Sequence, residues 1–225
     1  SVLIIEKRIE TKASKKDFTR IDDIRVIKNN RISNSPKKDA ITTAIAISKF
    51  DWIITTDADC VLPTYWLDTF DEFIQMHKPN CIVAPMTYHG PNSFFNRFQI
   101  LDFLSLQGAT IGGFGLWNPF LCNGANFAYR KSIFNAVDGF KENSEIASGD
   151  DIFLLEKFTK HDTKKVHYLK SPKVIVTTNP AKNSSELIQQ RLRWASKTSR
   201  STNRFAKGIG IIVLVGNLVC LEFIP

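Results

Sequence analysis

The chain has 225 residues, 43% hydrophobic and 11% aromatic, which suits one sizeable α/β core and excludes a globally disordered protein. Its four cysteines lack CxxC or Cys/His spacing, which argues against a zinc site and a disulfide framework and suits a reducing compartment. The net charge of +8 suits nucleic acid, a membrane surface or a phosphorylated ligand, and charge alone does not choose among them.

The first third of the chain predicts strands and a helix in alternation. Val2 to Ile5 and Ile24 to Ile27 are apolar runs that predict two strands on either side of a lysine-rich polar stretch. Apolar residues then recur at helical spacing from 40 to 47, and residues 52–56 predict a buried strand. A helix that leads into a strand in this way is typical of a parallel α/β arrangement.

The middle of the chain predicts two helices, a strand and a loop. One helix follows Pro63, and Cys81 to Met86 predicts a buried strand. Ser93 is expected to cap a second helix that turns an apolar stripe toward the core. The side chains of this stripe are Phe94, Phe98, Leu101 and Leu104. The glycine-rich stretch from Ala109 to Asn118 predicts a mobile or tightly turning loop.

The last third predicts three helices and a strand. Two helices are expected within Phe134 to Lys160, separated by the acidic turn Ser148-Gly149-Asp150-Asp151, and Lys173 to Thr178 predicts a β-branched strand. Residues 183–199 predict a further helix, because Asn183 and Glu186 have the spacing of a capping box.

A basic stretch precedes an apolar one near the C-terminal end. The basic side chains are Arg191, Arg193, Lys197, Arg200, Arg204 and Lys207. Residues 208–221 are apolar except for Asn217, but this run is shorter than the roughly 20 residues that span a bilayer. It is either the start of a transmembrane helix with a cytoplasmic basic flank or a buried core helix. We therefore divide the chain into 1–182 (core), 183–207 (helix with basic flank) and 208–225 (apolar segment).

Two acidic pairs are the first candidates for chemistry. Asp57-Ala58-Asp59 follows a predicted strand, where two close carboxylates suit a divalent cation and the phosphates that it carries, although a surface turn is the simpler reading. Asp150-Asp151 opens a helix, where acidic residues also act as ordinary N-terminal caps.

The third candidate is the segment Gln190-Arg191-Leu192-Arg193-Trp194. Gln190, Arg193 and Trp194 are three and four residues apart, so they share one helix face. An amide, a guanidinium and an indole make a suitable wall for a sugar or a diphosphate. The alternative is an arginine stacked on a surface tryptophan.

In this order, the three motifs resemble those of the family 2 glycosyltransferases, particularly the membrane-associated cellulose-synthase-like and poly-N-acetylglucosamine-synthase-like members. Lys37-Lys38-Asp39-Ala40-Ile41 resembles the family's Lys-x-x-Ala-Leu/Ile segment, and residues 120–130 resemble its acceptor-side segment. The resemblance spans residues 36–194. It implies the GT-A fold, a Rossmann-like mixed α/β sheet flanked by helices.

The resemblance also implies roles for the acidic residues. Asp59 would bind Mg²⁺ or Mn²⁺ directly, and Asp57 would contact the metal or the nucleotide, so that the leaving diphosphate is stabilised. Asp151 would be the base that takes the acceptor proton, and Asp150 the preceding acidic residue. Lys37 would lie near the donor nucleotide, with a solvated lysine as the alternative. One in-line displacement inverts the anomeric carbon.

The remaining implied roles concern the diphosphate and the acceptor. Gln190 and Arg193 would lie near the diphosphate, and Trp194 would stack on the acceptor sugar. Asn123 and Gly124 belong to the acceptor-side segment. The implied reaction moves a sugar from a nucleotide-sugar of the UDP type to a glycan or lipid acceptor, at the cytoplasmic face of the cell membrane.

The N-terminal part departs from the family pattern. The family opens with a strand that ends in a Pro-x-x-Asn-Glu-like segment and a second strand that ends in an acidic turn, and these cradle the uridine. Neither segment is visible in residues 1–35. We therefore expect the nucleotide-binding strands to be partly missing, and donor binding and activity of this chain alone to be weak or absent.

Three other functions fit parts of the sequence. An inactive membrane-associated binding module is disfavoured, because Asp59, Asp151 and Trp194 are all present. Nucleic acid is not an expected partner, because the basic residues concentrate beside the apolar segment rather than interleaving with aromatics. A metal-dependent nucleotidyltransferase could share the acidic tripeptide but would not call for the Gln-x-x-Arg-Trp helix.

Overall fold

A mixed sheet forms the centre of the molecule in the computed structural model, which describes residues 2–5, 24–141, 149–200 and 203–222. The strands lie in the order β3 (Trp52–Thr55), β6 (Phe127–Arg130), β4 (Cys81–Val83) and β7 (Val166–Tyr168). β6 is antiparallel to both β3 and β4, whereas β4 and β7 are parallel. The predicted mixed α/β class is confirmed, but the parallel arrangement expected at β3 is wrong, because β3 pairs with antiparallel β6.

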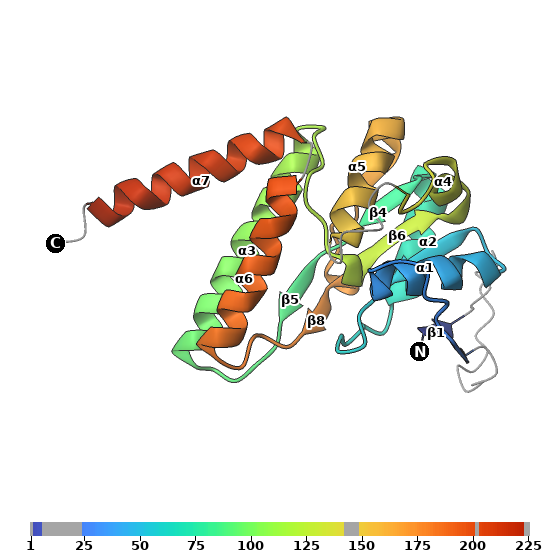
Figure 1. Cartoon of the computed structure of the whole chain (residues 1–225), viewed down its shortest axis with the longest axis horizontal. Coiled ribbons are helices and arrows are strands. Elements are labelled where there is room, and N and C mark those ends of the chain that lie inside the picture. Colours follow the sequence, from blue (N-terminus) through green and yellow to red (C-terminus); the bar gives the residue numbers. More distant parts are fainter. Residues whose placement is uncertain (1, 6–23, 142–148, 201–202, 223–225) are drawn as a thin grey trace.

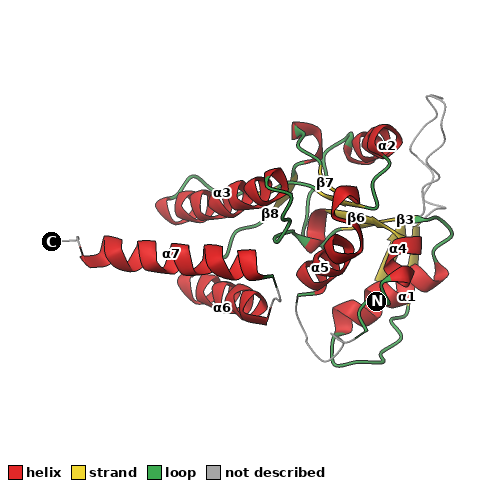
Figure 2. Cartoon of the chain, turned by 90° about the horizontal axis from the view of Figure 1, so that it is seen from above, coloured by secondary structure: helices red, strands yellow, loops and turns green. Residues whose placement is uncertain are grey.

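Helices cover both faces of this sheet, as Figures 1 and 2 show. Phe127 and Tyr129 of β6 point to one face, where they pack with residues of α1 (Pro36–Ile47), α4 (Lys131–Ala136) and α5 (Asp150–Asp162). Ala128 points to the other face and packs with α2 (Trp66–His77) and α3 (Phe94–Gly115). The alternation of side chains along one strand thus divides the core into two clusters.

Two smaller sheets complete the strand pairing. β1 (Val2–Ile5) and β2 (Ile24–Ile27) are antiparallel and have the bounds predicted from the sequence. The predicted strand from Cys81 to Met86 is divided at Ala84 and Pro85 into β4 and β5 (Met86–Tyr88). β5 pairs in parallel with β8 (Val176–Thr178), which is shorter than predicted because Pro172–Val174 forms a 3₁₀ turn.

The Asn126 side chain joins three segments of the core through hydrogen bonds. Its side chain is fully buried and accepts a hydrogen bond from Trp66 Nε1 at 3.0 Å. The amide nitrogen donates to the carbonyl oxygens of Pro85 and Val174 at 2.7 and 2.8 Å. Because both ends of the amide are bound, this polar group stabilises the core instead of disrupting it.

Helix α3 differs from its sequence prediction in length. Ser93 caps it as expected, since the Ser93 hydroxyl accepts from the Asn96 amide at 3.2 Å. The predicted glycine-rich loop is wrong, because the helix continues to Gly115. A Cβ at Gly113 would lie 2.7 Å from the Phe120 ring, so glycine serves close packing at this position rather than a turn.

Helix α3 also turns the opposite way to its prediction. The stripe expected in the core, Phe94, Phe98, Leu101 and Leu104, is exposed. The inward residues include Asn96, Gln99, Gln107 and Thr110. Gln99 supports this orientation, because it donates to Ala181 O at 3.1 Å and accepts from Ala181 N at 2.8 Å, and Phe103 on the same face is buried in the core. Turning the apolar stripe inward would break both bonds.

Two helices end the described chain. α6 (Ser184–Arg200) has the predicted cap, because Asn183 Oδ1 accepts from Glu186 N at 2.9 Å, while Glu186 accepts from Lys182 N at 2.9 Å. α7 (Arg204–Glu222) is anchored where the ring of Phe205 lies 5.4 Å from that of Phe120. Beyond this contact α7 projects away from the rest of the molecule (Figures 1 and 2). Within the described ranges, no helix combines the length and apolarity that crossing a bilayer requires.

Candidate active site

Lys37 joins two of the acidic motifs. It lies in the first turn of α1, and its Nζ is 2.9 Å from Asp57 Oδ1 and 3.6 Å from Asp150 Oδ2. Asp57 follows β3, and Asp150 is the first residue of α5. The structure therefore brings together three sequence-predicted site residues from three separate segments. Lys37 is also half-exposed, so solvent reaches the ammonium that bridges the two acids.

The surroundings of Lys37 keep it charged. Burial alone would lower the pKa of its amine, but the carboxylates of Asp150 and then Asp57 outweigh burial and hold the pKa above its usual value. Its half-exposed ammonium thus remains positive at neutral pH and balances the two acids.

A hydrogen-bonded turn fixes the position of Lys37. The Asp39 carboxylate accepts from Ile32 N at 3.1 Å, from Ser33 N at 3.0 Å and from the Ser33 hydroxyl at 2.8 Å. Burial opposes ionisation of Asp39, but these bonds and Arg31 prevail and lower its pKa to about 2. The first turn of α1, including Lys37, is therefore held against the segment before it.

Asp151 is oriented by backbone amides. Its Oδ2 accepts from Gly124 N at 3.2 Å, and its Oδ1 accepts from Ile152 N at 2.9 Å. A Cβ at Gly124 would lie 3.3 Å from Asp151 Cβ and 3.5 Å from Asp150 Oδ2. The Gly124 carbonyl accepts from the Thr55 hydroxyl. Asn123 directly precedes the 3₁₀ turn Gly124–Asn126, and Gly124 is the residue of this segment that contacts the acidic pair.

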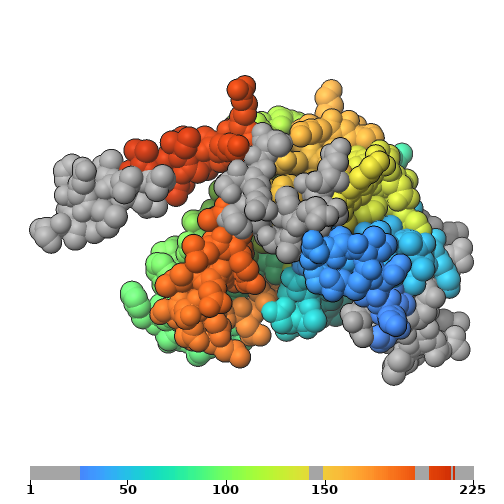
Figure 3. Space-filling view, viewed as in Figure 1, coloured from blue at the N-terminus to red at the C-terminus, as the bar shows by residue number. Residues whose placement is uncertain are grey.

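Asp59 and α6 line one open pocket. The pocket has a volume of about 740 Å³, and Figure 3 shows it as a hollow between α6, in orange, and the segment after β3, in cyan. Its lining residues are Asp59, Asn179, Pro180, Ala181, Lys182, Glu186, Gln189, Gln190, Leu192 and Arg193. Thr178 donates to Asp59 Oδ2 at 3.3 Å. The pocket thus unites Asp59 with Gln190 and Arg193, which sequence reasoning had placed near a diphosphate.

The other predicted α6 residue, Trp194, packs partly into the core. Its ring lies 6.2 Å from that of Phe103, and the Arg191 guanidinium lies 4.3 Å above it. Arg191 also pairs with Asp102. An arginine does stack on this tryptophan, as the alternative reading held, but it is Arg191, which leaves Arg193 at the pocket.

Comparison with known proteins identifies the family of this chain. The sequence model described as "Glycosyltransferase like family 2" matches residues 12–197. The chain belongs to this glycosyltransferase-like family. A crystal structure of S. aureus TarS 1-349 is similar with 14% identity and a TM-score of 0.43. The similarity covers 75% of this chain and 46% of that chain, so the chain spans less than half of the TarS structure. No curated protein sequence matches.

The residues of this glycosyltransferase domain fit a divalent cation only in part. In the described part of the chain, no three His, Cys, Asp or Glu side chains are grouped to hold a metal ion. Asp57 and Asp59 nevertheless offer hard carboxylate oxygens, and Mg²⁺ is commonly held by one or two carboxylates together with substrate phosphates. These residues therefore fit a cation that is shared with a ligand, with Asp59 at the pocket and Asp57 beside Lys37.

Sequence reasoning missed the residues that support this site. Thr55 binds Gly124, Thr178 binds Asp59, and Tyr88 donates to Gln190 at 3.5 Å. Asp102 on α3 pairs with Arg191 on α6. None of these residues belongs to a motif, and their partners are distant in the sequence, so no local pattern could have found them.

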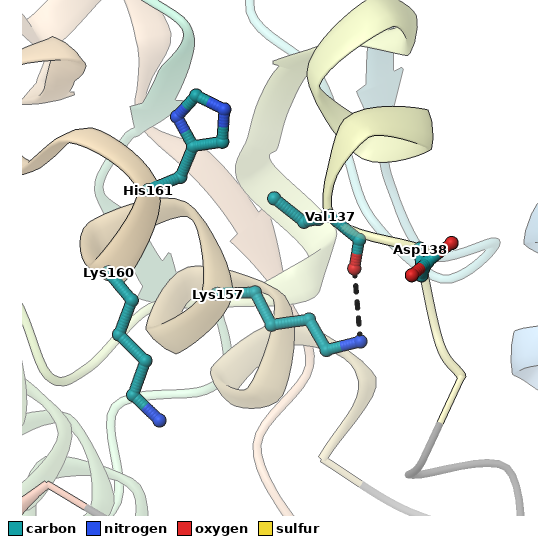
Figure 4. Close-up of a pocket in the computed structure, with 5 residues that line it drawn as sticks. All are labelled: Val137, Asp138, Lys157, Lys160 and His161. Carbon is teal, nitrogen blue, oxygen red and sulfur yellow. Dashed lines mark hydrogen bonds between the residues drawn. The ribbon is translucent and has the colours of Figure 1, made fainter.

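A second pocket lies between α4 and α5 and has a structural role. It has a volume of about 330 Å³ and is lined by the residues in Figure 4: Val137, Asp138, Lys157, Lys160 and His161. Lys157 Nζ donates to the carbonyl oxygens of Val137, Gly139 and Lys141 at 3.2, 2.9 and 2.9 Å. Lys157 therefore fixes the turn after α4 to α5.

Proposed function

We propose that this glycosyltransferase domain moves a sugar from a nucleotide-sugar of the UDP type to a hydroxyl of a glycan or lipid-linked acceptor, with inversion. The observation that carries the proposal is the bridge of Lys37 between Asp57 and Asp150. It joins the proposed leaving-group side of the site to the acidic pair that contains the proposed base. Asp151 lies next to this bridge, on the first turn of α5.

Asp151 is the proposed base. The hydrogen bonds from Gly124 N and Ile152 N orient its carboxylate. The acceptor hydroxyl gives its proton to Asp151 as its oxygen bonds to the anomeric carbon, and the bond from that carbon to the diphosphate oxygen breaks. Because attack and departure are in line, the product has the opposite anomeric configuration.

The donor is proposed to lie along the pocket beside Asp59. Gln190 and Arg193 line this pocket and would bind the diphosphate, while Lys37 supplies a positive charge at Asp57. Asp59 and Asp57 would hold Mg²⁺ or Mn²⁺, which when bound neutralises charge on the departing diphosphate.

The acceptor is proposed to lie against Trp194 and the turn that contains Asn123 and Gly124. Trp194 is half-buried, and Arg191 lies above its ring, so the remaining exposed part of the indole is the surface for a sugar. The hydrogen bond from Gly124 N to Asp151 Oδ2 joins this turn to the proposed base.

We also propose that the domain acts at the cytoplasmic face of the cell membrane, as in the cellulose-synthase-like and poly-N-acetylglucosamine-synthase-like members. The support is α7, where Ile211, Ile212, Val213 and Val215 are each more than half exposed. Exposed Arg204 and Lys207 precede them on the same helix. An apolar helix with a basic flank suits an anionic membrane surface.

The substitution Asp151→Asn tests the reaction. In the protein with any flanking sequence that its gene encodes, assayed with UDP-sugars and Mn²⁺, transfer should fall by about 10²-fold or more. Asp68→Asn, at an exposed position of α2, is the matched control and should retain transfer. Full turnover by Asp151→Asn would remove Asp151 as the base. Product NMR reports the anomeric configuration, and retention would contradict the in-line displacement.

Calorimetric titration of this chain with UDP and Mn²⁺ tests the donor site separately. We expect binding weaker than about 1 mM, because the uridine-cradling segments of the family are not visible in residues 1–35. Sub-millimolar binding would show that this expectation is wrong and that the donor site is intact. Tight UDP binding without transfer to any acceptor would identify a binding module instead of an enzyme.

A further inference from the structure

The outer face of α3 presents apolar side chains to solvent. It consists of Phe94, Phe98, Leu101 and Leu104, of which each is more than half exposed and Phe94 is 88% exposed. Their spacing places them along one stripe of the helix. A surface helix of a globular domain normally turns such a stripe inward, so its outward orientation calls for a partner.

The exposure of this face is fixed by the fold. On the opposite side of α3, Gln99 holds both backbone groups of Ala181, and Asn96 Nδ2 donates to Pro91 O at 2.8 Å. Rotating the helix to bury the apolar stripe would leave these polar groups without their bonds, and unpaired buried polar groups are costly. The outer face of α3 therefore stays outward.

We propose that the outer face of α3 lies in the interface of an anionic bilayer, as a second membrane contact beside α7. The proposal rests on the membrane association proposed above. Arg97 is exposed within the stripe and offers a cation to lipid phosphates. The stripe spans about 15 Å, which is too short to cross a bilayer but suits a helix that lies in its surface.

The position of α7 supports the same surface. Figures 1 and 2 place α3, α6 and α7 at one end of the molecule, where α7 projects beyond the other two. The sheet and α2 lie toward the other end. Contact between this end and a bilayer would cover the outer face of α3 and the exposed side chains of α7 together.

The distribution of exposed apolar side chains around α7 favours lipid over a protein partner. Ile211, Ile212 and Val213 are consecutive and all exposed, so they point in three directions around α7. Lipid surrounds a helix on several sides, whereas a protein partner covers one face. Arg97 within the stripe also favours lipid, because anionic headgroups balance its charge, whereas a second copy would add another Arg97 to the same contact.

Vesicle co-sedimentation of the full chain tests the proposal. Phe98→Glu and Leu101→Glu should each weaken binding to phosphatidylglycerol vesicles by about tenfold, because each removes apolar burial and adds a negative charge. Met76→Glu is the matched control, since Met76 is 68% exposed on α2. It should bind as the unmodified chain does. Arg97→Gln should weaken binding to anionic vesicles more than to phosphatidylcholine vesicles.

Variants of α3 and of α7 test the two proposed membrane contacts separately. If Ile212→Glu on α7 weakens vesicle binding while Phe98→Glu and Leu101→Glu do not, the α3 contact is overturned and the α7 contact stands. If the unmodified chain does not bind vesicles, both membrane contacts fail, but the transferase chemistry does not. A concentration-dependent dimer in sedimentation velocity that Leu101→Glu dissolves would assign the face to a second copy and overturn the proposal. Unchanged circular dichroism verifies that each variant folds.

Discussion

The ammonium of Lys37 lies 3.6 Å from the carboxylate of Asp150, so the first turns of α1 and α5 meet through an ion pair. The same ammonium binds Asp57 at 2.9 Å. Lys37 thus occupies the position of a cation between acids that would otherwise repel each other.

Replacing Lys37 with Met should strengthen Mn²⁺ binding in the absence of nucleotide. The substitution removes a positive charge beside Asp57, so the affinity for the ion should rise by about three- to tenfold at low ionic strength. The free Mn²⁺ signal in electron paramagnetic resonance measures this directly. Lys37→Arg and the exposed-site control Lys28→Met should both bind as the unmodified chain does. Equal affinity in Lys37→Met would show that Lys37 does not compete with the metal.

Gly124→Ala should impair transfer with little effect on folding. The new methyl group would lie 3.3 Å from Asp151 Cβ and 3.5 Å from Asp150 Oδ2, so the acidic pair must shift by a few tenths of an ångström. We expect transfer to fall by about tenfold, because base geometry is sensitive to small displacements. Kinetic assay and a thermal melt of the same sample separate the two effects.

Gly108→Ala is the control for that substitution. A Cβ at Gly108 in α3 meets nothing within 4 Å, so it should leave transfer unchanged and raise the free energy of unfolding by about 0.5–1 kcal/mol. If both alanine variants keep full activity, the close approach of Gly124 to Asp151 has no catalytic importance.

Asn126→Ala should strongly destabilise the fold. It leaves the indole N–H of Trp66 and the carbonyls of Pro85 and Val174 without their amide partner in the core. We expect a loss of about 3 kcal/mol in the free energy of unfolding, measured by urea denaturation. Asn135→Ala, at an exposed position of α4, should change it by less than about 0.5 kcal/mol. A small effect of Asn126→Ala would mean that water replaces the lost bonds.

Asp39 should make stability fall in acid. Its pKa is about 2 in the folded chain and 3.8 ordinarily, so the unfolded chain binds the proton first as pH falls. The stabilisation from Asp39 is therefore complete above about pH 4 and decreases as pH falls toward 2. Melting temperatures between pH 2 and 6 should show a shallower decline for Asp39→Asn than for the unmodified chain. Parallel curves would contradict the role of Asp39.

The sequence predicted the elements whose causes are local. The caps at Ser93 and Asn183 and the apolar runs of β1, β2 and β3 depend on neighbouring residues, and each lies where it was expected. The orientation of α3 could not be predicted in this way. It depends on the pairing of Gln99 with Ala181, which is remote in the chain.

The candidate site, too, could be predicted only where its residues form local motifs. The motifs around Lys37, Asp57 and Asp150 were found in the sequence, and the structure brings them together. The hydroxyls of Thr55 and Thr178, which hold Gly124 and Asp59, were not found. Threonine is common in strands, so neither residue indicates a functional site in the sequence before its distant partner is known.

The amide of Gln99 ties α3 to one stretch of the pocket wall. Ala181, which it holds by both backbone groups, lines the pocket with Asp59 and Arg193. A displacement of α3 along its axis would therefore pull on this stretch of the wall through the two hydrogen bonds of Gln99. A force applied to the outside of the molecule at α3 reaches this pocket through Gln99, and it reaches α6 through the ion pair of Asp102 with Arg191.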